Sequence, residues 1–101
     1  MTDARFDETI HAPVRLRTCG LLRAVDQLDF AVLRDALEVS DATLSKHLKT
    51  LASAGYVAHT KGASVGRNDA RRITWIALTS QGKSAFDSHM RALQEIATPK
   101  H

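Results

Sequence analysis

The sequence is short of the features that mark secreted proteins, membrane proteins and most enzymes. Its single cysteine, Cys19, excludes an internal disulfide, and the chain has neither a signal-peptide pattern nor an apolar run long enough to span a membrane. It also lacks a glycine-rich phosphate loop, a nucleophile motif and a zinc-hydrolase helix, and its five histidines are scattered. We therefore expect a cytoplasmic protein that is not an enzyme, with no cofactor and no contact with a membrane.

The positive charge of the chain is unevenly distributed. The 101 residues have a net charge of +3 and an isoelectric point of about 9.4. Residues 40–83 hold seven basic and two acidic side chains, whereas residues 1–39 hold five basic and seven acidic ones. Basic residues clustered in one part of a small domain indicate a polyanion as the partner.

The spacing of apolar and turn-forming residues predicts one domain over residues 11–97, preceded by a flexible polar segment over residues 1–10. Pro13 is expected to begin a helix that runs to about Val25, because proline is tolerated in a first helical turn. The predicted order continues with a short strand at 27–28, a helix-turn-helix over about 30–55, a hairpin over 57–78 and a final helix over 79–97.

The second helix of the predicted helix-turn-helix, residues 41–54, has two different faces. Ser40 is expected to cap its start, and Gly55 to end it in the left-handed conformation. Leucines form one apolar stripe at i, i+4 and i+7: Leu44, Leu48 and Leu51. The opposite face carries small, hydroxyl and cationic side chains, which suit a helix that approaches phosphates and base edges. A solvated face on an ordinary core helix is the alternative interpretation.

Three sequence strings, in this order, resemble parts of winged-helix transcriptional regulators. LSKHLKTLASAGYV (Leu44–Val57) is similar to the recognition-helix signature of the ArsR and MarR families. NDARRITWIALTSQGKSAF (Asn68–Phe86) is similar to the MarR-type wing and its junction with the last helix, and HAPVRLRTCGLL (His11–Leu22) resembles the first helix of small single-domain regulators. The resemblance implies an α+β, mainly α fold: a winged helix-turn-helix with a three-helix core, a β-hairpin wing and a C-terminal dimerisation helix.

The resemblance also implies which residues contact DNA. In MarR-like proteins an Asp-x-Arg pair in the wing directs its arginine into the minor groove, and this pattern falls on Asp69 and Arg71. The exposed positions of the recognition helix would enter the major groove. Together with the neighbouring basic and hydroxyl side chains, the expected DNA-binding residues are Ser40, Ala42, Thr43, Ser45, Lys46, Lys49, Lys61, Arg67, Asp69, Arg71 and Arg72.

The first and last predicted helices carry more apolar residues than a small core needs, which indicates a partner subunit. The expected dimer-interface residues are Val14, Leu21, Phe86, Met90 and Leu93. We therefore expect a homodimeric, sequence-specific regulator of transcription, a repressor, that binds a palindromic operator in double-stranded DNA. Helix 41–54 would lie in the major groove and loop 62–71 at the minor groove. The sequence identifies no effector.

Two alternatives remain open. The same surfaces could recruit a different protein, which would make the chain a winged-helix interaction module. The chain could also be a metal- or redox-gated sensor of the ArsR type, because Asp87 and His89 match half of a metal site known in that family and Cys19 could act as a reactive thiol. Two ligands make a weak metal site, so we expect no bound metal.

Overall fold

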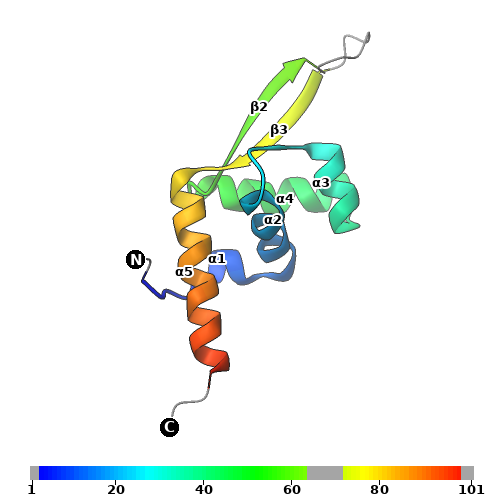
Figure 1. The fold of residues 1–101 in the computed structure, drawn as a ribbon. Helices are drawn as coiled ribbons and strands as arrows, with labels where there is room; N and C mark the ends of the chain where they lie inside the picture. The colour runs from blue at the N-terminus through cyan, green and yellow to red at the C-terminus, as the bar shows by residue number, and fades with distance from the viewer. Residues whose placement is uncertain (1–2, 64–71, 99–101) are drawn as a thin grey trace.

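The computed structural model describes residues 3–63 and 72–98, and it is mainly helical with one small sheet (Figure 1). The elements are α1 (Glu8–His11), α2 (Pro13–Arg23), β1 (Leu28–Asp29), α3 (Phe30–Leu37), α4 (Asp41–Ser53), β2 (Val57–Ala63), β3 (Arg72–Leu78) and α5 (Ser80–Ala97). The β2–β3 hairpin stands out from the helices, and the C-terminal half of α5 extends beyond them on the opposite side (Figure 1). The predicted fold class is therefore confirmed.

The sheet is antiparallel, with the strand order β1-β3-β2. β2 pairs with β3 from Val57↔Leu78 to Ala63↔Arg72, and β1 adds the pairs Leu28↔Ile76 and Asp29↔Trp75. The short strand predicted at 27–28 thus lies one residue further along. Because β3 is the central strand, it fixes the base of the hairpin to the segment that leads into α3.

The core lies where α2, α3 and α4 meet the base of the sheet. The leucine stripe of α4 is buried as predicted, with Leu44 and Leu51 at 0% exposure and Leu48 at 4%. The other large apolar side chains of the core come from α1, α2, α3, β2 and β3: Ile10, Leu22, Leu33, Leu37, Val57, Ile76 and Leu78. Burying each of these leucine side chains contributes about 1.5–3 kcal/mol to the free energy of folding. The stripe therefore anchors α4 to the core.

Short polar side chains begin the helices, as the sequence predicted. Asp29 Oδ1 accepts from the Ala31 N–H at 2.8 Å, and Ser40 Oγ accepts from the Thr43 N–H at 3.1 Å. Gly55 ends α4 with a φ of 83°. The turn between α3 and α4 has Glu38 in the left-handed region, with a φ of 57°, at a position where glycine would be less strained.

The prediction of a flexible segment over residues 1–10 differs from the structure. Glu8–His11 form α1, and Ile10 is completely buried in the core. Asp7 Oδ1 accepts from the Ile10 N–H, and the Arg5 N–H donates to the Ser88 carbonyl at 3.0 Å. A four-residue helix has too few apolar residues to show a periodic pattern, so tertiary contacts rather than propensity produce it.

Candidate nucleic-acid interface

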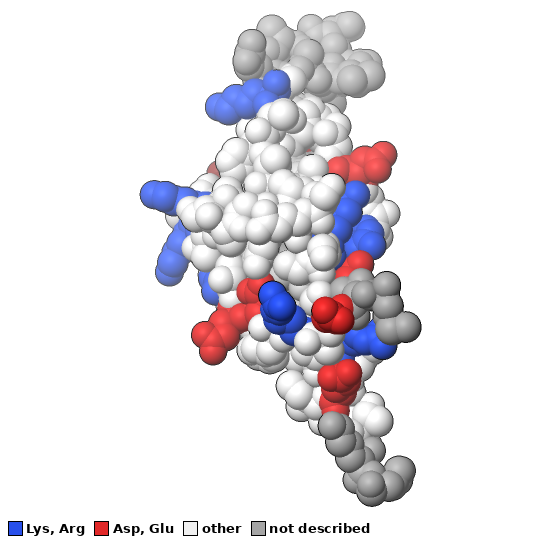
Figure 2. Space-filling model, turned by 90° about the vertical axis from the view of Figure 1, so that its left-hand side faces the viewer, with Lys and Arg blue, Asp and Glu red and all other residues white. Residues whose placement is uncertain are grey.

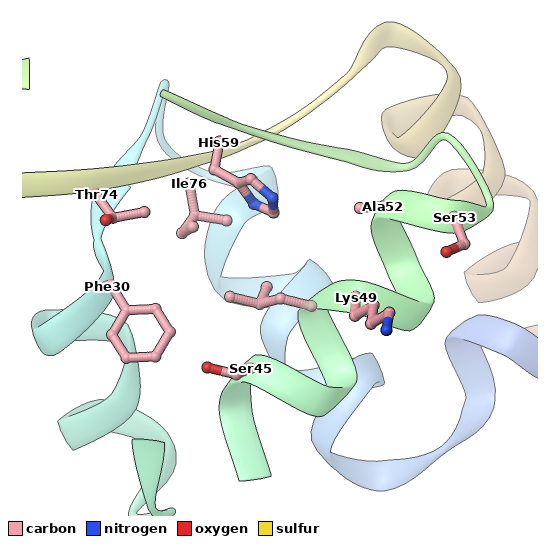
Figure 3. Close-up of a pocket in the computed structure, with 9 residues that line it drawn as sticks. Phe30, Ser45, Lys49, Ala52, Ser53, His59, Thr74 and Ile76 are labelled. Atoms are coloured by element: carbon pink, nitrogen blue, oxygen red, sulfur yellow. The ribbon is translucent and has the colours of Figure 1, made fainter. Parts of the chain in front are cut away.

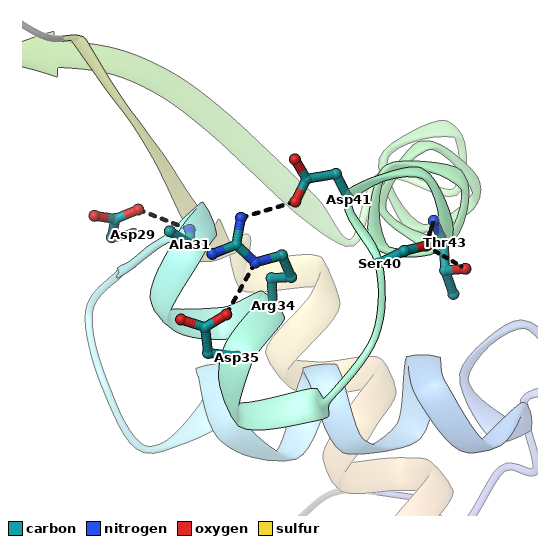
Figure 4. Close-up of polar contacts among 7 residues, drawn as sticks. All are labelled: Asp29, Ala31, Arg34, Asp35, Ser40, Asp41 and Thr43. Atoms are coloured by element: carbon teal, nitrogen blue, oxygen red, sulfur yellow. Dashed lines mark hydrogen bonds and ion pairs between the residues drawn. The ribbon is translucent and has the colours of Figure 1, made fainter.

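An arginine ties the two helices of the helix-turn-helix together (Figure 4). The Arg34 guanidinium on α3 donates to Asp35 Oδ1 at 2.9 Å and to Asp41 Oδ1, in the first turn of α4, at 2.8 Å. These two hydrogen bonds, the one to Asp35 first, raise the pKa of Arg34 above its ordinary value. The bridge spans the turn at Glu38 and helps to set the angle at which α4 leaves α3.

The outer face of α4 carries the predicted recognition residues. The exposed ones are Ser40, Ala42, Ser45, Lys46 and Lys49. Thr43 is half-buried, and its hydroxyl oxygen lies 3.0 Å from Ser40 Oγ, which also caps the helix. Ala42, Ser45, Lys46 and Lys49 are therefore free of the cap and exposed to solvent. Ser40 and Thr43 are instead joined to each other in the N-terminal cap of α4.

His47 lies beside the leucine stripe and contacts α2. Its Nδ1 is 3.0 Å from an Arg15 guanidinium nitrogen on α2, and because arginine only donates, Nδ1 must accept. Burial, followed by the charges of Arg15 and Lys46, lowers the pKa of His47. The neutral ring is thus a contact between α2 and α4.

The face of the hairpin that turns toward α4 adds polar and cationic groups to the interface. Side chains alternate along a strand, so Val57, His59 and Lys61 of β2 share one face. Their partners on β3 are Leu78, Ile76 and Thr74 respectively. The strand runs from the buried Val57 at the base of the hairpin to the exposed Lys61 further out. Lys61 therefore lies where a wing contact was predicted.

The remaining predicted wing residues are only partly within the structure. Arg72 is the first residue of β3, where it pairs with Ala63. Arg67, Asp69 and Arg71 lie outside the described residues. Their assignment continues to depend on the resemblance to the MarR-type wing.

A hollow of about 640 Å³ lies between α4 and the hairpin (Figure 3). α4 provides Ser45, Leu48, Lys49, Ala52 and Ser53; the hairpin provides His59, Thr74 and Ile76; and α3 provides Phe30. Figure 3 shows the His59 ring directed from β2 toward α4. The floor of the hollow is therefore apolar, and hydroxyl, imidazole and ammonium groups line its rim.

Sequence reasoning missed His59. Its only signal was its place two residues before Lys61, which puts both side chains on one face of a predicted strand. Without the tertiary structure, nothing indicated that this face turns toward the recognition helix.

The predicted dimer-interface residues fall into three groups. Val14 and Phe86 pack against the chain's own core, and Met90 and Leu93 are half-buried on α5. Leu21 is 39% exposed on α2. Other large apolar side chains are also exposed: Phe6, Val25, Val32 and Ile96.

Cys19 and the Asp87–His89 pair have structural surroundings that bear on the sensor alternative. Cys19 is completely buried, and burial, followed by the nearby Asp7, raises the pKa of its thiol to about 11. Asp87 binds the Arg23 guanidinium through two hydrogen bonds of 3.0 Å, and His89 is buried on another side of α5. Over residues 3–63 and 72–98, no three His, Cys, Asp or Glu side chains gather as they would around a metal ion.

Charges of both signs are mixed on the side of the molecule that Figure 2 shows. Figure 2 shows Lys and Arg interspersed with Asp and Glu down its right edge and over its lower part, a run of Lys and Arg along its upper left edge, and uncharged side chains over its middle. The middle of this face therefore lacks the single-sign patch that attracts a polyanion.

Among the helices that the structure describes, none is both long and apolar enough to cross a membrane.

Comparison with known proteins agrees with this geometry. The protein MJ0432 of Methanocaldococcus jannaschii, whose function is uncharacterized, is 29% identical over 84 residues, which cover 83% of this chain and 87% of that protein. The fold matches the transcriptional regulator homologue of Pyrococcus horikoshii OT3 with a TM-score of 0.79 at 20% identity, over 90% of this chain and 86% of that one. It matches MepR in the S. aureus MepR–DNA complex with a TM-score of 0.69 at 22% identity, over 90% of this chain and 71% of that one.

At such identities the solved structures establish the fold, whereas the family follows from the sequence. The model of the winged helix DNA-binding domain matches residues 14–97, which is most of the chain. The match begins in α2 and ends with α5, so it includes the helix-turn-helix and the hairpin. The chain therefore belongs to the family of winged helix DNA-binding domains, which are not enzymes.

Proposed function

We propose that this protein regulates transcription by binding a specific site in double-stranded DNA, with residues 11–97 acting as the DNA-binding domain. Helix 41–54 would enter the major groove, and the wing over 62–71 would lie at the minor groove. The observation that carries the proposal is the exposed polar and cationic face of α4 beside the hollow that the hairpin lines with His59, Thr74 and Ile76.

In this proposal, different residues of the interface provide affinity for the DNA backbone and preference for a base sequence. Lys49 and His59 line the hollow, and the exposed Lys61 lies two residues beyond His59 on the same face of β2. A DNA strand that passes between α4 and the hairpin would place its phosphates near both ammonium groups, and His59 would add a third contact. Ala42, Thr43, Ser45 and Lys46, nearer the start of α4, would contact base edges. A good base contact of this kind discriminates by about 1–3 kcal/mol.

We propose that the regulator is a homodimer formed through α2 and α5. The support is the exposed apolar side chains of α2, the residues just after it and α5, namely Leu21, Val25 and Ile96, together with the half-buried Met90 and Leu93. A two-fold dimer would place its recognition helices about 34–36 Å apart and would therefore bind a palindrome. A dimer across an operator would exclude RNA polymerase, so we propose repression, in the cytoplasm, as its action.

The test is a fluorescence-anisotropy titration against a labelled pool of random duplexes at two salt concentrations, followed by sequencing of the bound fraction. We expect affinity that falls as salt rises and a bound fraction enriched in a palindrome with half-sites one helical turn apart. Enrichment of an asymmetric site would contradict the dimer but keep DNA binding. Absence of binding at low salt would contradict the proposal and favour a protein-interaction module.

A further inference from the structure

A buried histidine on α5 holds the N-terminal segment of the chain. His89 is 0% exposed, and its Nδ1 accepts a hydrogen bond of 2.9 Å from the backbone N–H of Asp7. Its Nε2 lies 3.2 Å from Nδ1 of His11, the last residue of α1. The Phe6 ring packs against both imidazoles, with centroid distances of 4.7 Å to His11 and 4.8 Å to His89. Both ring nitrogens of His89 therefore form hydrogen bonds to the N-terminal segment, one with Asp7 and one with His11.

These contacts determine where the protons lie. A backbone N–H can only donate, so His89 Nδ1 carries no proton and the neutral ring must be protonated on Nε2. His89 Nε2–H then donates to His11 Nδ1, which must also lack a proton. The arrangement requires both rings to be neutral. A proton added to His89 Nδ1 would break the bond to Asp7, and one added to His11 Nδ1 would bring two N–H groups head-on.

We propose that His11 and His89 form an acid-sensitive latch that fastens residues 3–11 to α5, and that protonation of the pair releases this segment. The other ionisable groups around the pair do not replace it as the sensor. Asp7 is the acidic group beside His89, and its carboxylate already accepts from the Ile10 N–H and the Tyr56 hydroxyl. On α2, the Arg15 guanidinium donates to the Thr9 carbonyl and to His47, and the buried Cys19 lies near Asp7 and Arg15.

Electrostatics supports the direction of the switch. Burial and the neighbouring His11 lower the pKa of His89, and the weaker opposing effect of Asp7 does not reverse this. Because the folded protein binds this proton less readily than the unfolded chain, the latch is complete above about pH 6.5 and weakens as pH falls below that value.

Release of residues 3–11 would also change contacts at the end of α4. Asp7 bonds to Tyr56, which directly follows the Gly55 end of α4. The Tyr56 carbonyl accepts from the Thr79 N–H at 3.0 Å, next to the first turn of α5. Through Asp7 the latch therefore contacts the junction of the recognition helix, the hairpin and α5, and the segment that it holds includes Ile10 of the core.

The experiment is nuclear magnetic resonance on the full chain as the pH is lowered from about 7.5 to about 5. Long-range ¹⁵N correlations of the imidazoles should show His89 protonated on Nε2 at the higher pH. Protection of the Asp7 amide and the order of residues 3–11 should then fall together as His89 is protonated. The protection factor is expected to fall by about tenfold per pH unit for each proton taken up.

Variants separate the latch from a general effect of acid. His89→Gln should abolish the acid transition in residues 3–11. His11→Gln, whose amide oxygen can accept from His89 at any pH, should move the transition to lower pH. His59→Gln, on β2, is the matched control and should leave the transition unchanged. A His89 proton on Nδ1, unchanged order of residues 3–11 after His89 is protonated, or a transition that persists unaltered in both latch variants would overturn the proposal.

Discussion

Arg15 on α2 and His47 on α4 lie 3.0 Å apart, between a guanidinium nitrogen and the imidazole Nδ1. This contact joins the recognition helix α4 to α2. His47 lies on a different side of α4 from Ser45 and Lys49, which line the hollow. The contact differs from the leucine stripe because its strength depends on pH. Only the neutral imidazole can accept from arginine, so acid removes the bond and leaves two cations facing each other.

The Arg15–His47 contact predicts a pH-dependent part of the stability. The pKa of His47 is lower in the folded protein than in the unfolded chain, so its contribution is complete above about pH 6.5 and is lost as pH falls. His47→Asn should retain an acceptor without titrating, and its free energy of unfolding should fall less below pH 6.5 than that of the wild type. Urea unfolding followed by Trp75 fluorescence measures this. His59→Asn, on the hairpin, is the control and should follow the wild-type profile.

The leucine stripe predicts that Leu48→Ala destabilises the whole protein. Leu48 is 4% exposed, and truncating a buried leucine costs about 2–5 kcal/mol. Ser45→Ala, one turn earlier on the exposed face, should change the free energy of unfolding by no more than about 0.5 kcal/mol. Urea unfolding of both variants measures the difference. Equal effects would mean that α4 is not anchored through its apolar face.

The proposed phosphate contacts predict how salt changes DNA affinity. Lys49→Ala and Lys61→Ala should each weaken binding to every sequence by a similar factor and reduce the slope of log affinity against log salt by about 1. Lys83→Ala, on α5, is the matched control and should retain the wild-type slope. Anisotropy titrations over a salt series measure it. If Lys49→Ala instead changed which sequence is preferred, Lys49 would be a base contact.

The proposed dimer predicts that a charge on α5 breaks the assembly. Ile96 is 72% exposed near the end of α5, and Ile96→Lys would place an ammonium group in an apolar interface. Val32→Lys, at a 53% exposed site on α3, makes the same chemical change away from α2 and α5. Sedimentation at micromolar concentration should find dimers for the wild type and Val32→Lys and monomers for Ile96→Lys. A monomeric wild type would remove the homodimer.

The burial of Cys19 predicts an unreactive thiol. Its pKa of about 11 leaves little thiolate near neutral pH, and the side chain is not accessible. A thiol reagent such as Ellman's reagent should modify the native protein only as fast as it unfolds, and should react promptly once denaturant is added. Rapid modification of the native protein would contradict this burial and would favour the redox-gated sensor.

Local patterns in the sequence were enough to predict most of the elements. The caps at Asp29, Ser40 and Thr79 are hydrogen bonds to N–H groups two or three residues away, and the stop at Gly55 is a conformation of one residue. The leucine stripe of α4 has helical periodicity, and the β-branched run of β3 is typical of a strand. Such signals act within a few residues, so the sequence alone determined the order of the elements from α2 to α5 and the exposed face of α4, but not α1.

Tertiary structure decided whatever depends on residues far apart in the chain. Ile10 forms part of α1 because it enters a core built by later segments, and His89 is buried because α1 and Asp7 cover it. His59 faces the recognition helix only because β2 pairs with β3 in one register. Burial and close approach arise when distant segments pack together, and no local pattern of charge or hydropathy specifies which polar side chains that packing will join.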